Sequence, residues 1–272
     1  MLYDQNRVLL RGGGDLATGV AYRLHHSGFP VIVTELPHPL VVRRRVALAT
    51  AVLEGEVTIE DLRGICVGSV DEALQLAQTG VIPVLISPEL PAALLSSSLV
   101  VVDARMAKRN IDTRIDQAPL VIALGPGFTA GVDCHAVIET NRGHRLGRVI
   151  WQGQAEADTG TPGLIGDKAA ERVLRAPTDG EISWLKEIGD RVREGEVIGM
   201  VNHHPLLAPF DGVVRGLIAP GSAVPLGLKI GDVDPRGDVE ACFTVSDKAL
   251  AIGGGVLEAI LNRLSISQER KE

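Results

Sequence analysis

The sequence is poor in aromatic residues and in cysteine. Only 3% of its 272 residues are aromatic: 4 Phe, 2 Tyr and 2 Trp. Because base and sugar recognition depends on aromatic stacking, this scarcity disfavours sequence-specific RNA binding and sugar-stacking platforms. The three cysteines, Cys66, Cys134 and Cys242, are an odd number at wide spacings. They fit neither a disulfide framework nor a structural zinc site.

Basic residues are also in deficit, and long apolar runs are missing. The 27 Lys and Arg residues against 34 Asp and Glu give a formal net charge of −7. Such a chain has no field that attracts nucleic acid or anionic lipid, so neither is an expected partner. No run of about 18 apolar residues occurs, and residues 1–10 resemble no signal peptide. We therefore expect a cytoplasmic protein.

Apolar aliphatic residues and glycine are abundant. Hydrophobic residues make up 45% of the chain, which also has 31 Gly and 15 Pro. This composition can bury a sizeable core and excludes low-complexity disorder. The length exceeds that of a typical single core, so two compact units are expected.

The first half of the chain predicts an α/β domain over residues 1–153. Its apolar runs lack alternation, which is typical of parallel strands buried on both faces. The first run ends at three glycines and is followed by a helical pattern that begins at Asp15. A second helix is expected from Pro39 to about Leu53. The expected strands lie at residues 7–11, 30–35, 64–68, 81–87, 99–103 and 120–125.

The second half, residues 154–245, contains an internal repeat with a period of 32. Eleven of 26 positions match without a gap when residues 176–201 are compared with 208–233. Matched glycines and turn residues predict two copies of one β-hairpin unit related by a pseudo-two-fold axis. Residues 246–272 predict a C-terminal helical segment that is interrupted at Gly253-Gly254-Gly255. The sequence leaves open whether this segment packs on the first domain.

A glycine turn carries the strongest local signal. Gly12, Gly13 and Gly14 precede Asp15 and Thr18 in the expected first helix, where backbone N–H groups can approach an anion. Glu35 ends the next strand, at the usual position of an acid that binds a ribose hydroxyl. The pattern departs from G-x-G-x-x-G. A phosphate or nucleotide-like ligand and a merely structural tight turn both remain open.

Three further clusters follow expected strands or begin a helix. Arg43 and Arg44 belong to a run of three arginines that suits either an anion or a solvated helix face. The set Asp103, Arg105, Lys108 and Asn110 directly follows a buried run, where open α/β sheets bind ligands. A second glycine turn holds Gly125 and Gly127 and could bind an anion or merely turn the chain.

A polar loop follows the apolar residues 136–138. Glu139, Thr140, Arg142 and His144 combine proton-transfer and anion-binding groups, although a plain polar turn explains them equally. The candidate catalytic residues are thus His144, Glu139, Asp103 and Lys108, with no role assigned.

Cysteine and histidine offer weaker candidates. Cys134 stands beside His135, but adjacent strand residues point to opposite faces, which favours a buried structural cysteine. The pairs His25-His26 and His203-His204 lack metal-ligand spacing, so no metal site is expected.

Two resemblances extend this interpretation. The repeated Ala-Pro-x-Asp-Gly … Gly-Asp-x-Val-x-x-Gly pattern resembles the barrel-sandwich hybrid of biotinyl and lipoyl domains, although residues 202–206 at the hairpin tip lack the carrier lysine. This resemblance implies an all-β scaffold or docking domain. The blocks RGGGDLATG, VTELPHPLVVRRRVA, VVDARMAKRNID, ALGPGFTAGVDCHAVIETNRGHRLGRVI, DTGTPG, GLKIGDVDPRG and SDKALAIGGGVLEAI look like the selenium-dependent molybdenum hydroxylase accessory family, the YqeB type.

The second resemblance implies a cytoplasmic maturation protein for molybdenum hydroxylases with a Rossmann-like domain. It implies a molybdopterin-type cofactor in the Rossmann-like crevice and an apo-hydroxylase as partner. Its site residues would be Gly12, Gly14, Asp15, Thr18, Glu35, Arg43, Arg44, Asp103, Arg105, Lys108, Asn110, Gly125, Gly127, Glu139, Thr140, Arg142 and His144, followed by Asp234, Arg236 and Lys248.

The residues themselves leave other functions open. One alternative is an enzyme that depends on NAD, FAD or ATP in the same crevice. A second is a non-catalytic structural adaptor. Catalytic competence, the oligomeric state and the identity of the phosphate-bearing small molecule stay open, with a homo-oligomer among the expectations.

Overall fold

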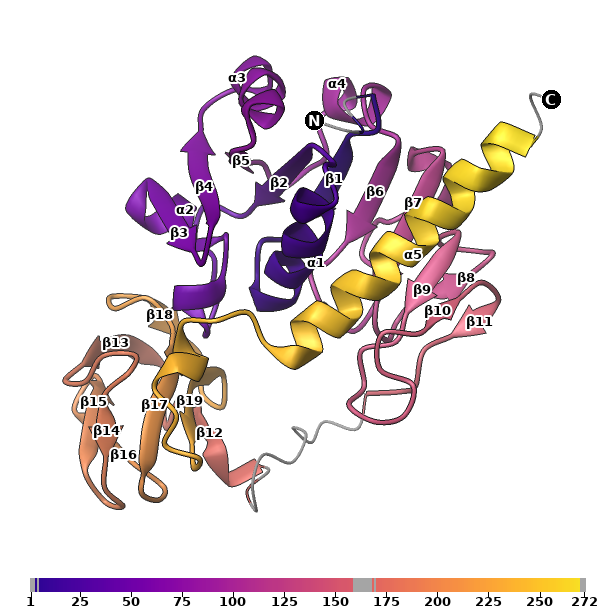
Figure 1. Cartoon of the computed structure of the whole chain (residues 1–272). Coiled ribbons are helices and arrows are strands. Elements are labelled where there is room, and N and C mark those ends of the chain that lie inside the picture. The colour runs from indigo at the N-terminus through magenta and orange to yellow at the C-terminus, as the bar shows by residue number, and fades with distance from the viewer. Residues whose placement is uncertain (1–2, 4, 159–167, 169, 270–272) are drawn as a thin grey trace. The chain divides into compact units, whose positions relative to one another are not determined.

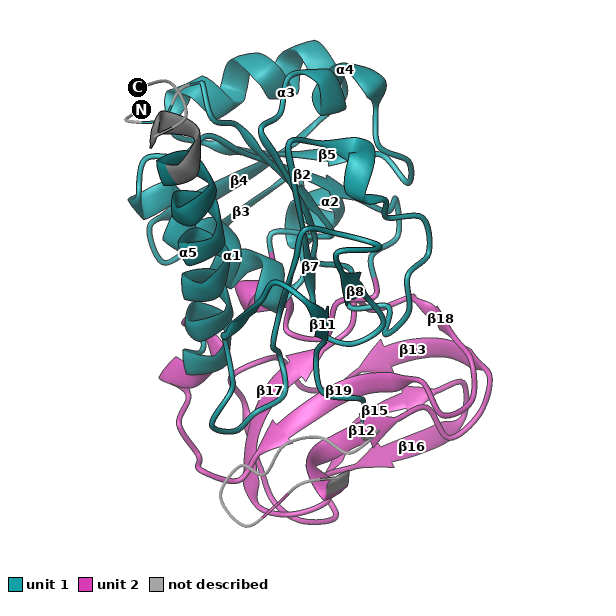
Figure 2. Cartoon of the chain, turned by 90° about the vertical axis from the view of Figure 1, so that its right-hand side faces the viewer, with its two compact units in different colours: residues 1–39, 48–158, 245–272 teal, residues 40–47, 159–244 magenta. Residues whose placement is uncertain are grey.

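The computed structural model describes residue 3, residues 5–158, residue 168 and residues 170–269. The chain divides into two compact units, which are coloured separately in Figure 2. Unit 1 comprises Met1–Pro39, Leu48–Asp158 and Val245–Glu272, and unit 2 comprises Leu40–Ala47 and Thr159–Thr244. Each unit therefore contains segments that are far apart in the sequence.

Unit 1 is built on a nine-stranded sheet (Figure 1). The strand order is β10-β9-β7-β6-β1-β2-β5-β4-β3. The seven central strands are parallel, and β3 and β10 pair antiparallel at the two edges. The strands are β1 (Val8–Arg11), β2 (Val31–Glu35), β3 (Glu56–Ile59), β4 (Leu62–Val67), β5 (Ile82–Ile86), β6 (Val100–Asp103), β7 (Leu120–Leu124), β9 (Ala136–Ile138) and β10 (Val149–Ile150).

The prediction of a Rossmann-like, all-parallel sheet is wrong, because this sheet is large and mixed. Glu60 and Asp61 alone connect β3 to β4, and a connection this short forces the two strands to pair antiparallel. Glu60 has a φ of 54°, as tight hairpin turns require. A separate two-stranded sheet joins β8 (Thr129–Ala130) to β11 (Gly153–Gln154).

Helices cover both faces of this sheet. Ala73 of α3 and Leu94 of α4 belong to a buried cluster with Leu9 and Val137. Ile138 points to the face opposite Val137, where its side chain meets α5 at Gly255. The helices are α1 (Asp15–His26), α2 (Thr50–Glu54), α3 (Val70–Leu76), α4 (Ala92–Ser96) and α5 (Asp247–Glu269), with 3₁₀ turns at Ala77–Thr79 and Ile115–Gln117.

The predicted interruption at Gly253-Gly254-Gly255 is wrong, because α5 is one continuous helix of 23 residues (Figure 1). The glycines allow close packing instead. A Cβ on Gly253 would lie 2.3 Å from the carbonyl oxygen of Gly19 in α1, and one on Gly255 would lie 2.1 Å from that of Gly147. The pattern that suggested a break therefore lets α5 approach the backbone of its neighbours.

The predicted helix from Pro39 to Leu53 is also wrong. The segment forms only a 3₁₀ turn at Arg44–Val46 and the short helix α2. Residues 40–47 belong to unit 2, where Val42 packs on the core and Arg43 bridges to Leu217. Long-range packing thus overrides the local helical pattern.

Unit 2 contains two four-stranded antiparallel sheets. Their orders are β12-β19-β17-β14 and β16-β15-β13-β18. Short 3₁₀ turns lie at Ala170–Arg172 and Glu240–Cys242. The strands are β12 (Val173–Arg175), β13 (Gly180–Trp184), β14 (Arg191–Val192), β15 (Val197–Val201), β16 (His204–Leu207), β17 (Gly212–Leu217), β18 (Ala223–Val224) and β19 (Lys229–Asp234).

The 32-residue repeat reappears in the strand pairing of unit 2. Gly180 of the first copy pairs with Val224 of the second, and Val192 of the first pairs with Gly212 of the second. Strand β13 of the first copy thus pairs with β18 of the second, and its equivalent β17 in the second copy pairs with β14 of the first. The prediction of one barrel-sandwich hybrid is nevertheless wrong, because the strands form two separate sheets and unit 2 also includes residues 40–47 from the first half of the chain.

Among the described residues, no helix combines the length and apolarity needed to cross a bilayer, α5 included.

Candidate functional site

The carboxyl ends of β1, β2 and β6 lie at one edge of the unit 1 sheet. Sheet order reverses at β1, because β2 pairs on one side of it and β6 on the other. Ligands of open α/β sheets bind where the order reverses, outside the carboxyl ends of the strands. The loops that follow these strands are therefore the first place to examine.

The glycine turn after β1 is packed closely on its neighbours. Gly12 has a φ of 91°, and a Cβ there would lie 3.2 Å from the Arg105 Cα atom. A Cβ on Gly13 would lie 2.8 Å from the amide nitrogen of Ala49, whose N–H donates to the Gly13 carbonyl at 2.8 Å. Close backbone packing thus accounts for Gly12 and Gly13 without a ligand. Gly14 is the N-cap of α1 and contributes no side chain to it.

Glu35 lies directly on this turn. Its Oε2 accepts the Gly13 N–H at 2.7 Å, and its Oε1 accepts the Leu36 N–H at 2.7 Å. The side chain is partly exposed. The Glu35 carboxylate therefore already accepts the Gly13 N–H, which would bind a phosphate in a conventional glycine turn. The N–H groups that remain for a ligand are those at the start of α1.

Thr18 has a structural role within α1. Its hydroxyl donates to the Gly14 carbonyl at 3.0 Å and accepts the Leu48 N–H at 3.0 Å, and the side chain is fully buried. Asp15 begins the same helix and has an interaction partner.

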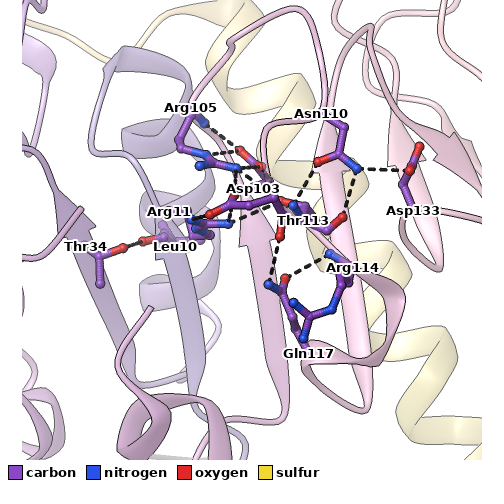
Figure 3. A network of polar contacts seen from close by, with 11 residues as sticks. Leu10, Arg11, Thr34, Asp103, Arg105, Asn110, Thr113, Arg114, Gln117 and Asp133 are labelled. Carbon is purple, nitrogen blue, oxygen red and sulfur yellow. Dashed lines mark hydrogen bonds and ion pairs between the residues drawn. The ribbon is translucent and has the colours of Figure 1, made fainter. Parts of the chain in front are cut away.

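A network of arginine and aspartate side chains joins the ends of β1 and β6 (Figure 3). Arg11 donates to both oxygens of Asp112 at 2.8 and 2.9 Å. Arg105 holds both oxygens of Asp103 through Nε at 3.1 Å and Nη2 at 2.6 Å, and its Nη2 also reaches Asp112. The Thr113 hydroxyl donates to Asp103 at 2.6 Å. Two guanidiniums thus balance two carboxylates.

Burial and pairing set the charges of this network. Arg11 and Asp103 are almost completely buried, whereas the Asp112 side chain is 48% exposed. Hydrogen bonds from Arg11, and then from Arg105, outweigh desolvation and lower the pKa of Asp112 to about 2. Burial disfavours the charged form of Arg105, but Asp103 and Asp112 outweigh it and raise the pKa of this guanidinium. Asp112 and Arg105 are therefore ionised at neutral pH.

The loop after β6 has unusual backbone angles and is held in place by side-chain contacts. Met106 and Lys108 have φ values of 55° and 61°, which are unusual for residues with a Cβ. Asn110 donates to the Thr113 carbonyl at 2.9 Å and to Asp133 at 3.0 Å. Lys108 forms an exposed ion pair with Asp158 at 2.7 Å.

The second glycine turn, after β7, packs against this same loop. A Cβ on Gly127, whose φ is 100°, would lie 2.5 Å from the Arg109 Cα atom. One on Gly125 would lie 2.4 Å from the Thr140 hydroxyl. Loops after β6, β7 and β9 thus interlock, and steric crowding explains these glycines without an anion.

The residues of the polar loop after β9 bind different partners within the protein. Glu139 is 1% exposed, and its two oxygens accept the amides of Asn141 and Glu156 at 2.7 and 2.8 Å. Arg142 holds Asp247 at 2.7 and 3.0 Å, and His144 is exposed. Of the four catalytic candidates, Asp103 accepts four hydrogen bonds, Glu139 is buried with one backbone amide on each oxygen, and Lys108 is paired with Asp158.

The remaining predicted residues belong to unit 2 or to α5. Arg43 and Arg44 belong to unit 2, where Arg44 donates to the Leu217 carbonyl at 2.8 Å. Asp234 and Arg236 pair with each other in unit 2, and Lys248 lies on α5.

Cys134 is not suited to act as a nucleophile. It is fully buried, and desolvation, with added repulsion from Asp133 and Asp103, raises the pKa of its thiol to about 12. His135 accepts the Val121 N–H through Nδ1 at 3.0 Å. In the part of the chain that the structure covers, no group of three or more His, Cys, Asp or Glu side chains could hold a metal ion.

Sequence reasoning missed Arg11, Asp112 and Thr113. Arg11 offered a signal, since a charge at the last position of a buried strand requires a partner. Nothing local identified Asp112, which is 101 residues away.

Comparison with known proteins finds a relative whose name states no activity. No family model matches the chain. It is 52% identical over 254 residues to "Uncharacterized protein YqeB" of Escherichia coli (strain K12), a match that covers 93% of this chain and 47% of that protein. The chain is thus related to YqeB and spans about half of the length of this relative.

Two solved structures of low similarity illustrate the structural comparison. A succinylglutamate desuccinylase/aspartoacylase from Rhodobacter sphaeroides is 17% identical, covering 86% of this chain and 87% of that one, with a TM-score of 0.26. An aspartoacylase family protein from Mesorhizobium loti is 13% identical, covering 84% of each chain, with a TM-score of 0.28. Scores this low carry no argument about the activity of this chain.

The predicted role in molybdenum hydroxylase maturation, with its molybdopterin cofactor and selenium dependence, is wrong. The solved structures compared are two succinylglutamate desuccinylases, an aspartoacylase family protein and an ectoine utilization protein, and none of these four is named as a molybdenum protein. Two of the predicted crevice residues, Arg43 and Arg44, belong to unit 2 rather than to the unit that carries the nine-stranded sheet.

Proposed function

We propose that this relative of YqeB binds a small phosphate-bearing molecule at the carboxyl ends of β1 and β2 in unit 1. Its phosphate would lie against the first turn of α1, and a hydroxyl group of the same molecule would bind Glu35. One observation carries the proposal: the Glu35 carboxylate is fixed on the Gly13 amide, beside the open N-terminus of α1, at the point where the sheet order reverses.

The start of α1 supports the phosphate contact. The first N–H groups of a helix have no intrahelical partner and carry a partial positive charge. Gly14 at the N-cap has no side chain that could satisfy or shield them. Asp15 lies in the same turn and opposes negative charge. This combination favours a phosphodiester or diphosphate bridge, with one negative charge per phosphate, over a doubly charged monoester.

Glu35 supports the hydroxyl contact. An ionised carboxylate offers about four lone-pair positions, and the two backbone amides occupy one on each oxygen. The partly exposed carboxylate is therefore held in position and can still accept hydrogen bonds from a ligand. A ribose-like diol, with adjacent hydroxyl donors, matches this arrangement.

The arginine–aspartate network supports the site by fixing its shape. Arg105 lies against the glycine turn at Gly12, so the loop after β6 forms one wall. Asp103 and Asp112 already neutralise the charges of Arg11 and Arg105. The network is therefore a rigid wall rather than the phosphate receptor.

Isothermal titration calorimetry with ADP-ribose, AMP and adenosine tests this function. We expect saturable binding of ADP-ribose, weaker binding of AMP, and little heat with adenosine. Glu35→Gln loses one acceptor and its charge, and we expect at least a tenfold loss of ADP-ribose affinity, about 1.4 kcal/mol.

Glu72→Gln is the matched control, because Glu72 also accepts a backbone amide after a parallel strand, that of Gly68 at 3.0 Å. It should bind ADP-ribose as the native protein does. Absence of binding by any probe, or equal ADP-ribose affinity in Glu35→Gln, would refute the proposed site.

A further inference from the structure

Unit 2 contains a buried arginine without a hydrogen bond. Arg215 lies in β17 and is 8% exposed. Its one ionic contact among the described residues joins Nε to Asp234 Oδ2 at 3.7 Å, which is too long for a hydrogen bond. Nε is completely buried and has no partner. A buried guanidinium in this state is costly unless another group completes it.

The neighbouring carboxylates are committed to other arginines. Arg236 holds Asp234 through its backbone N–H and Nε at 3.0 Å and through Nη2 at 2.6 Å. Arg172 reaches both oxygens of Asp232 at 2.6 and 2.8 Å. Arg215 therefore stands beside two acids that already have close partners.

A fourth guanidinium adds to the local positive charge. Arg43 lies beside β17, where it bridges to Leu217, two residues beyond Arg215. It donates to the Ala241 carbonyl at 3.0 Å. Burial first, and then repulsion by Arg43, lower the pKa of Arg215. The neighbouring charge thus destabilises the ionised form of Arg215.

Arg215 lies in a cluster with Arg43, Arg172, Arg236, Asp232 and Asp234. Asp232 has its close contacts with Arg172 and Asp234 has its close contacts with Arg236, so the shortest ionic contact of Arg215 among the described residues stays at 3.7 Å.

We propose that Arg215 binds the oxyanion group, a carboxylate or a phosphate, of a small molecule that enters unit 2. Among the guanidinium nitrogens of Arg215, only Nε is both completely buried and without a partner, and 10% of the side chain is exposed. The planar fork of a guanidinium matches two oxygens of a carboxylate or phosphate. Arg43 and Arg236 would add favourable charge without direct contact being required. This site is separate from the one proposed in unit 1.

Thermal unfolding with inorganic phosphate or succinate, at an ionic strength held constant with sodium chloride, tests the site. We expect at least one anion to raise the melting temperature saturably, by about 5 °C at a hundred times its dissociation constant. A response to phosphate alone assigns a phosphate ligand, and a response to succinate alone assigns a carboxylate.

Arg215→Met separates binding from structure. Methionine keeps the apolar stem and removes the unpaired charge, so the variant should melt at a higher temperature than the native protein without anion. It should also lose the anion response. Arg215→Lys keeps the charge without the fork and should bind the anion at least tenfold more weakly.

Arg175→Gln is the control, because Arg175 is an exposed arginine of unit 2 that donates to the Gly227 carbonyl. It should respond to the anion as the native protein does. The proposal is overturned if neither anion acts on the native protein, or if Arg215→Lys responds with unchanged affinity. It is also overturned if Arg215→Met is destabilised, fails to fold or keeps the response, because Arg215 would then be a structural residue.

Discussion

Replacing adjacent glycines of α5 by alanine should change the free energy of unfolding in opposite directions. Gly254 is half-buried, and a Cβ there would meet nothing within 4 Å. Gly255 is buried, and a Cβ there would lie 2.1 Å from the Gly147 carbonyl oxygen and 3.0 Å from Ile138 Cγ2. Gly254→Ala and Gly255→Ala therefore add the same methyl group to the same helix in different surroundings.

The magnitudes follow from helix propensity and packing. Alanine is favoured over glycine by about 1 kcal/mol inside a helix, so Gly254→Ala should be more stable by about that amount. Gly255→Ala gains the same propensity, but its Cβ must move by roughly 1 Å to reach ordinary contact with Gly147. Overpacking of this kind costs about 1–3 kcal/mol, and more where the backbone cannot yield. We expect Gly255→Ala to be destabilised by about 1–2 kcal/mol.

Far-UV circular dichroism during thermal and urea unfolding measures both changes. Each of the described helices α1 to α5 lies in unit 1, so the helical signal reports this unit. Melting should rise by about 2–4 °C in Gly254→Ala and fall by a similar amount or more in Gly255→Ala. Equal effects at the two positions, or a more stable Gly255→Ala, would refute the close packing of α5.

Two further predictions concern ionisable groups. Because Arg11 and Arg105 lower the pKa of Asp112 to about 2, from 3.8, its stabilising contribution is complete above pH 3.8 and is lost as the pH falls through 2. Asp112→Asn should therefore lower the free energy of unfolding by about 1 kcal/mol at neutral pH, after allowance for solvent screening; urea unfolding should show this difference shrinking below about pH 4, and a difference that persists in acid would contradict the ion pairs. Burial raises the pKa of Cys134 to about 12, so iodoacetamide near neutral pH should label the half-buried Cys66 and spare Cys134 until the protein unfolds. Mass spectrometry of the labelled peptides decides the point, and native labelling of Cys134 at the rate of Cys66 would contradict its burial.

Local sequence patterns located individual strands but not their partners. The apolar runs near residues 31–35 and 120–124 coincide with β2 and β7, because a short uninterrupted apolar run suits a strand buried on both faces. The antiparallel edges of the sheet depend on the two-residue turn at Glu60 and Asp61 and on the return of β10 to β9. No hydrophobic periodicity reports such pairings, and the all-parallel expectation failed there.

Glycine was the most ambiguous signal in the sequence. The same residue that can admit an anion also admits a neighbouring backbone. Gly12, Gly13 and Gly127 all contact backbone atoms of segments that are distant in the sequence. In α5, three consecutive glycines suggested a break, whereas Gly253 and Gly255 allow close packing against α1 and the loop at Gly147. Only the position of the second segment distinguishes these uses.

The two arginine clusters show why charge patterns alone could not identify binding residues. The positive charges of Arg11 and Arg105 are compensated by Asp103 and Asp112 through close contacts. This network can therefore fix the geometry of the loops, but it offers no uncompensated charge to a ligand.

In unit 2, the acids beside Arg215 are held by Arg172 and Arg236, and Arg215 itself makes no hydrogen bond within the described chain. Both clusters consist of arginine and aspartate side chains, and their spacing in the sequence does not distinguish them. The difference is the number of close carboxylate oxygens available to each guanidinium. That difference predicts that removing Arg215 changes anion binding, whereas removing Asp112 changes stability.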